Sequence, residues 1–97
     1  MTVKEAVDII NAAKIYTPHS VEDVIDMADM KEIATIEQDE HRWYVLGTVV
    51  FQAGNEFFGV RGPISLKSEN MGYDDVLHVC EAFEMVQVPS VTYSRKI

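Results

Sequence analysis

The sequence predicts an α+β fold in which two N-terminal helices pack on a small antiparallel sheet of four to five strands, with a short helix before the last strands. Three observations predict this class. Apolar residues recur at helical spacing in the first thirty positions, a two-residue alternation follows, and turn residues separate the later segments. Because 47% of the residues are apolar, residues 1–97 can form one small globular domain with its own core.

The first helix is predicted by its N-terminal cap. In Thr2-Val3-Lys4-Glu5, the threonine side chain can accept a hydrogen bond from a backbone amide while Glu5 reaches back. The helix should end near Lys14, a cation suited to a C-terminus. Its apolar stripe consists of Val3, Val7 and Ile10.

A second helix is expected to begin at Ser20, where the sequence repeats the capping pattern of the first. One face would carry Val21, Val24, Ile25 and Ala28. The opposite side would then present an exposed acidic row. This row consists of Glu22, Asp23, Asp26 and Asp29.

Strands are expected from residue 32 onward. The strongest is Arg42 to Gln52, which is rich in aromatic and β-branched residues and is apolar on both faces. Both faces must therefore be covered, by a helix, a partner chain or a ligand. The other expected strands are Glu32–Glu37, Phe57–Arg61 ended by Gly62-Pro63, a candidate short strand at Ile64–Lys67, Glu81–Val88, and an edge strand at Val91–Tyr93. The short helix is expected over Tyr73–Val79.

The formal net charge of −8 argues against direct binding of nucleic acid, because that binding depends on clustered Lys and Arg. Residues 1–41 hold ten of the sixteen acidic residues and three of the eight basic ones, so the two halves present different surfaces. One cysteine, no signal peptide and no long apolar run predict a cytoplasmic protein that does not bind membranes.

The residues that could bind a metal or act in catalysis are not grouped in the sequence. His78 and Cys80 are the only His/Cys pair that is close, and His19 and His41 lie far away, so no metal or cofactor is expected. Cys80 is interpreted as a buried structural cysteine. The acidic pairs fall in helix first turns or in a polar turn, where solvated carboxylates suffice, so no catalytic residue is predicted.

These observations favour a non-enzymatic, cytosolic interaction or accessory module that binds a protein partner. A first alternative is a small-molecule-binding domain or small enzyme with a pocket near the 43–61 hairpin. Trp43, Tyr44 and Phe57 would line that pocket and Arg61 would bind an anionic group.

A second alternative is an acidic mimic of nucleic acid, whose row of carboxylates occupies the basic groove of a partner. Self-association is a further expectation. If helices cover only one face of the sheet, the other face could pair with a second copy, and two-fold dimers are the commonest outcome.

Overall fold

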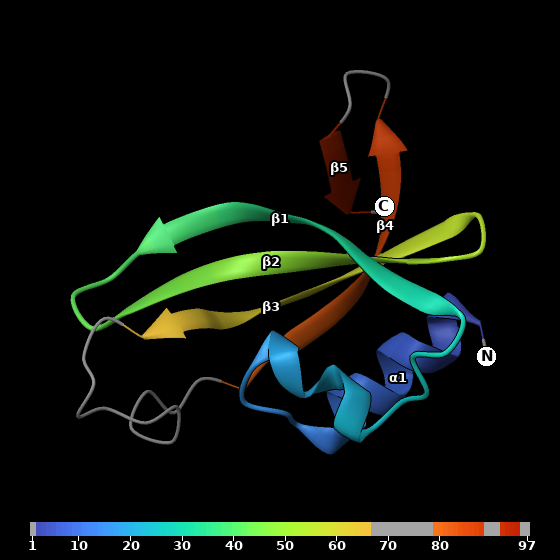
Figure 1. Cartoon of the computed structure of the whole chain (residues 1–97), viewed down its shortest axis with the longest axis horizontal. Helices are drawn as coiled ribbons and strands as arrows, with labels where there is room; N and C mark the ends of the chain where they lie inside the picture. Colours follow the sequence, from blue (N-terminus) through green and yellow to red (C-terminus); the bar gives the residue numbers. More distant parts are fainter. Residues whose placement is uncertain (1, 67–78, 89–91, 96–97) are drawn as a thin grey trace.

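A computed structural model describes residues 2–66, 79–88 and 92–95 of the chain, and its elements form an antiparallel meander preceded by helices (Figure 1). The sheet order is β1-β2-β3-β4-β5, with every strand antiparallel to the next. The helices are α1 (Val3–Ala13) and the 3-10 helix η1 (Pro18–Asp23). The strands are β1 (Met30–Glu40), β2 (Tyr44–Ala53), β3 (Glu56–Leu66), β4 (Glu81–Val88) and β5 (Thr92–Arg95).

The first predicted helix is confirmed, with the cap expected from the sequence. The Thr2 hydroxyl oxygen accepts a hydrogen bond from the backbone N–H of Glu5 at 3.2 Å. The helix ends at Lys14, whose backbone is left-handed with φ of 53° and whose N–H donates to the Ile10 carbonyl. The apolar stripe of α1 is buried against the sheet at Val3, Ala6 and Ile10.

The second predicted α-helix is wrong, because the chain forms only the short 3-10 helix η1 there. Its cap is Thr17 rather than Ser20. The Thr17 hydroxyl accepts from the His19 N–H at 3.3 Å and donates to the Pro63 carbonyl at 3.1 Å. Pro18 follows directly, at the first helical position where its missing N–H costs nothing.

The helix also stops early, because Asp26 uses its side chain locally. Its carboxylate accepts from the Ala28 N–H at 2.9 Å, which closes a turn in place of a further helical turn. Val24 and Ile25 add two β-branched residues with low helix propensity. The expected stripe is thus split, with Val21 buried on η1 and Ile25 buried in the turn that follows.

Strand β1 is longer than predicted and runs through positions expected to be a polar turn. It pairs with β2 from Met30 to Glu40, and its register shifts between Glu32 and Ala34 and again between Ile36 and Asp39. Glu37, in the second irregular segment, has φ of 53°. Bulges of this kind admit extra residues into a strand without ending the ladder, which the alternation pattern alone does not indicate.

Strand β3 does not end at Gly62-Pro63, as the sequence suggested, but continues to Leu66. Pro63 lies opposite Leu46, where the register of the β2–β3 pair shifts next to Val45. An irregular ladder position accommodates a residue that has no N–H to donate. The predicted strands at 57–61 and 64–67 are therefore one continuous strand over the described residues.

The predicted strand at Glu81–Val88 is confirmed as β4, and β5 pairs with its last four residues. Val79 and Cys80 lead into β4, and the Cys80 N–H donates to the Ile15 carbonyl at 2.8 Å. The short helix predicted at 73–79 lies outside the described residues, except for Val79, which is not helical. Val91, the first residue of the predicted edge strand, also lies outside them.

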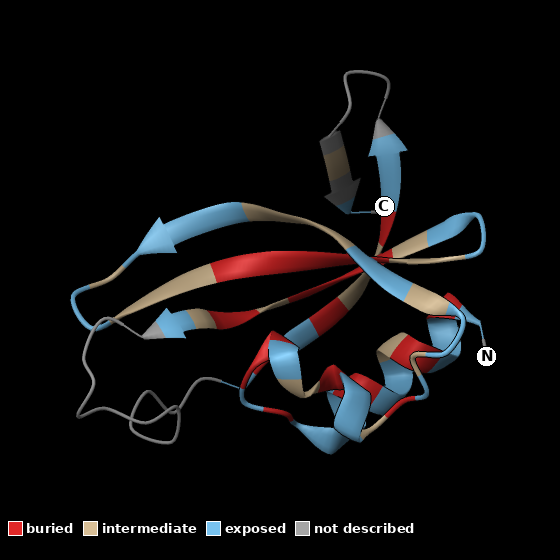
Figure 2. Ribbon diagram, in the orientation of Figure 1, coloured by how far each residue is buried: buried red, intermediate tan, exposed pale blue. Residues whose placement is uncertain are grey.

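Both helices lie on the same face of the sheet, and the core forms between them and that face (Figures 1 and 2). The core side chains of the sheet alternate along β2 and β3, as the period of two requires. They are Val49 and Phe51 of β2, Phe58 and Val60 of β3, and Ala82 of β4. In the described part of the chain, no helix is long and apolar enough to cross a membrane.

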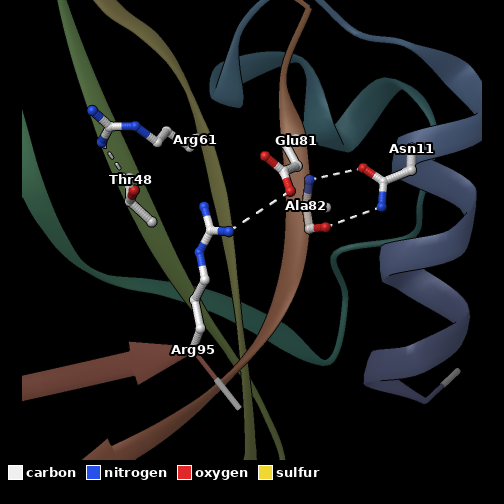
Figure 3. A network of polar contacts seen from close by, with 6 residues as sticks. All are labelled: Asn11, Thr48, Arg61, Glu81, Ala82 and Arg95. Carbon is white, nitrogen blue, oxygen red and sulfur yellow. Dashed lines mark hydrogen bonds and ion pairs between the residues drawn. The ribbon is translucent and has the colours of Figure 1, made fainter. Parts of the chain in front are cut away.

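One polar side chain of α1 completes the edge of β4. The Asn11 amide donates to the Ala82 carbonyl at 3.0 Å and accepts from the Ala82 N–H at 2.8 Å (Figure 3). β5 pairs with β4 only from Met85 onward, so at Ala82 the amide satisfies backbone groups that no described strand reaches. This pair of hydrogen bonds joins the helix to the sheet edge.

Candidate functional site

The face of the sheet opposite α1 and η1 carries the side chains that best qualify as a binding surface. Residues directly opposite one another in an antiparallel sheet share a face. The strand register therefore places one connected set of side chains on this face, which we call the helix-free face. It includes Thr48 and Val50 of β2, Phe57, Gly59 and Arg61 of β3, Glu81, Phe83 and Met85 of β4, and Tyr93 and Arg95 of β5.

The innermost side chains of this face are buried although no described helix covers them. Thr48 and Val50 are 0% exposed and Met85 is 4% exposed. Gly59 makes room for their neighbours, since a Cβ there would lie 2.9 Å from the Phe83 ring and 3.0 Å from the Thr48 methyl group. The larger side chains of the face therefore close over a small apolar layer.

Aromatic rings form much of that cover. The ring centroids of Phe57 and Tyr93 are 5.3 Å apart, although β4 lies between their strands. In a flat sheet, strands on either side of a third are about 10 Å apart. The two rings therefore lean toward each other across β4, where Met85 is the direct partner of Phe57.

Two arginines, Arg61 of β3 and Arg95 of β5, belong to the same face (Figure 3). Arg61 donates to the Glu37 carbonyl at 2.7 Å and to the Thr48 hydroxyl at 3.4 Å, so the irregular segment of β1 holds its guanidinium. Arg95 lies 3.9 Å above the Phe83 ring centroid and 3.8 Å from the Glu81 carboxylate. Both guanidinium groups keep donors that these contacts do not use, since each has five N–H groups.

The four residues expected to line a pocket are only partly brought together. Phe57 and Arg61 share the helix-free face, but Trp43 and Tyr44 lie at the β1–β2 turn. Tyr44 and the residue paired with Phe57 are eight positions apart on β2, roughly 26 Å along a strand. Trp43 is 45% exposed with the Arg42 guanidinium 4.7 Å from its ring, and Tyr44 stacks on His41.

Phe83, Tyr93 and Arg95 belong to the surface but were not singled out from the sequence. Phe83 and Met85 alternate within a predicted strand, which indicates a shared face. Which strand lies beside them, however, depends on pairings between residues far apart in the chain. The signal that was present is local: Phe83 and Met85 occupy alternate positions of β4, and Tyr93 and Arg95 occupy alternate positions of β5.

The acidic residues of the first half do not form the predicted helical row. Glu22 and Asp23 lie on η1, whereas Asp26 and Asp29 lie in the turn before β1, and all four side chains are exposed. The spacing of three and four that would align them on an α-helix therefore does not apply. Binding of this segment to a basic partner stays a prediction.

Cys80 is 4% exposed and therefore buried, as predicted, and Gly62 packs against its sulfur. Burial raises the pKa of its thiol from 9.0 to about 12. The thiolate is the reactive form, so at neutral pH the sulfur of the folded protein is a poor nucleophile. His78, its neighbour in the sequence, lies outside the described residues.

We expect the native protein to resist alkylation by iodoacetamide at neutral pH and to react fully once unfolded in urea. The neutral thiol contributes to stability below pH 9.0, and that contribution is lost as the pH rises toward about 12. Above pH 9.0 the wild type should therefore lose stability that Cys80→Ala does not. Alkylation of folded protein as fast as that of a free thiol would contradict this.

Within residues 2–66, 79–88 and 92–95, no three His, Cys, Asp or Glu side chains are grouped so that they could hold a metal ion. Comparisons with protein-family models, curated proteins and solved structures found no match to this chain. The structure thus defines an α+β protein whose antiparallel meander has helices on one face and aromatic and arginine side chains on the other.

Proposed function

We propose that this protein is a binding module that holds a partner protein against its helix-free face. One observation carries the proposal: Phe57, Arg61, Phe83 and Tyr93 are half-buried, and Arg95 is exposed, over an apolar layer that no described helix covers. Aromatic residues and arginine are the types enriched at protein interfaces and at their energetic centres.

The charge of this face indicates the kind of partner. The whole chain has a net charge of −8, yet the described residues of the helix-free face include two guanidinium groups, those of Arg61 and Arg95, beside the carboxylate of Glu81. An acidic group beside an apolar patch on the partner would complement it. Two copies of the chain meeting through this face would set one pair of arginines against a surface that carries the same pair, so a different protein is the favoured occupant.

The test compares two double variants of matched composition. Phe83→Ala/Arg95→Glu removes a ring and reverses a charge on the helix-free face. Tyr16→Ala/Lys4→Glu makes the same kinds of change at exposed residues on the helical side. Binding partners are captured from the source cells with immobilised protein, identified, and measured by titration, after circular dichroism has verified folding.

We expect the face variant to weaken partner binding by about tenfold or more, as removal of central interface residues does, and the control to bind as the wild type. The proposal would be contradicted if Phe83→Ala/Arg95→Glu still bound the partner while the control Tyr16→Ala/Lys4→Glu did not. Light scattering supplies a second readout. A dimer that the face variant dissociates would assign this surface to a second copy instead.

A further inference from the structure

The end of β4 extends beyond the strand beside it. Pairing between β3 and β4 stops at Phe57 and Met85, one residue after the start of β3 at Glu56. β4 continues to Val88 and there pairs with β5. The hairpin of β4 and β5 therefore projects from the sheet, away from the helices (Figure 1). From Val86 onward, β4 has a described strand on one side only.

A cleft of about 320 Å³ lies between this projecting part of β4 and the β2–β3 turn. Its accessible apolar surface includes Val86, which is 39% exposed, whereas Val3 at the start of α1 is only 2% exposed. Its polar border carries Glu56 and Glu84. The described residues that line the cleft are Val3, Asn55, Glu56, Phe57, Glu84, Met85, Val86 and Gln87.

A second depression, of about 260 Å³, adjoins the first and shares Val3 and Glu56 with it. It reaches the turn before β1, where Asp26 and Asp29 contribute two more carboxylates. Among the residues that the structure describes, none of those lining either depression is Lys, Arg or His. We call the two together the acidic groove. Four carboxylates, those of Asp26, Asp29, Glu56 and Glu84, lie along its border.

We propose that the acidic groove binds an extended, basic segment of a partner protein, which adds to the free edge of β4 beyond Met85. The unpaired backbone groups of such an edge can pair with an added strand. Side chains alternate along an extended segment, so one set can pack on the exposed Val86 while the other set places Lys or Arg beside Glu56 and Glu84. Because the described residues of the groove include carboxylates and no cation, a positively charged segment is favoured over a negatively charged one.

This site is separate from the arginines of the helix-free face, although the cleft shares Phe57 and Met85 with that face. The two surfaces select opposite charges. A basic segment suits the groove, whereas an acidic group suits Arg61 and Arg95. Variants that remove only carboxylates of the groove therefore test it independently of the proposed function.

The probe is a display library of short random peptides selected against the full chain. We expect the enriched peptides to alternate Lys or Arg with apolar residues. A synthetic copy of one of them should shift the backbone amide resonances of Val86 and Gln87 in a heteronuclear NMR titration. The variant Glu56→Gln/Glu84→Gln should weaken its binding about fivefold at low salt, and less at high salt.

Glu22→Gln/Asp23→Asn is the matched control, because it neutralises two exposed carboxylates of η1 outside the groove. It should bind the peptide nearly as the wild type does. Phe83→Ala/Arg95→Glu should also retain the peptide, which distinguishes this site from the helix-free face. The proposal is overturned if the library enriches no peptide, if the enriched peptides lack cations, or if the control weakens binding as much as the groove variant.

Discussion

Phe58→Ala is expected to lower the free energy of unfolding by about 3–5 kcal/mol, the usual cost of removing a buried ring from a core. Phe58 is 0% exposed, and its ring stacks on Phe51 with centroids 5.1 Å apart. Since small domains are stable by only about 5–15 kcal/mol, the variant should be close to unfolding at body temperature. Urea denaturation followed by circular dichroism measures the change.

The stability lost in Phe83→Ala is to be compared with that lost in Phe58→Ala, because the difference tells a binding surface from a core. Phe83 is a phenylalanine of the same sheet, but it lies half-buried on the helix-free face. Its truncation should cost less than about 2 kcal/mol, because part of the ring is already in water. If both variants lose equal stability, the helix-free face is a second core rather than a binding surface, and the proposed function loses its main support.

Gly62→Ala is expected to destabilise the protein by about 1–3 kcal/mol, the usual cost of adding a methyl group to a well-packed interior. A Cβ at this position would overlap the Cys80 sulfur and lie 3.2 Å from the Pro18 Cδ. The overlap cannot be relieved by a flexible side chain, since a cysteine has only one side-chain torsion to adjust. Thermal and urea unfolding of the variant would both report the loss.

Cys80→Ala should rescue part of that loss, because it removes the atom that the new methyl group meets. A double-mutant cycle between the two positions should give a favourable coupling of about 1 kcal/mol or more. Gly54→Ala is the control. Its φ of 62° makes any side chain strained, but nothing lies within 4 Å of the added Cβ. Cys80→Ala should not rescue Gly54→Ala, and additive losses at Gly62 and Cys80 would contradict the packing argument.

Local signals explain why α1 was predicted correctly and η1 was not. The cap at Thr2 and the apolar stripe of α1 agree with each other within one short segment. In the second segment two caps compete, one at Ser20 and one at Thr17. Thr17 prevails because its hydroxyl also reaches the Pro63 carbonyl, 46 positions along the chain. That bond exists only once β3 lies beside this segment, so the sequence pattern could not rank the two caps.

The sheet shows the same division between local and non-local causes. The aromatic and β-branched content of residues 42–52 predicted β2, and the alternation of side chains in residues 81–88 predicted β4. The extension of β3 through Pro63 depends on a register shift in its partner strand. The extension of β1 depends likewise on bulges opposite β2. The alternation of apolar and polar side chains within one strand does not predict the hydrogen-bond register between that strand and its neighbour.

The sequence by itself determined the α+β class, the position of α1, the strong central strand and the apolar character of both its faces. It also indicated Phe57 and Arg61, because an aromatic ring and a cation at alternating positions of one strand must share a face. Only the tertiary structure decided that Phe83, Tyr93 and Arg95 join them, and that Trp43 and Tyr44 lie elsewhere. The physical reason is that cross-strand neighbours such as Gly59 and Phe83 are chosen by packing between distant segments, where a glycine on one strand leaves space for a ring on the next.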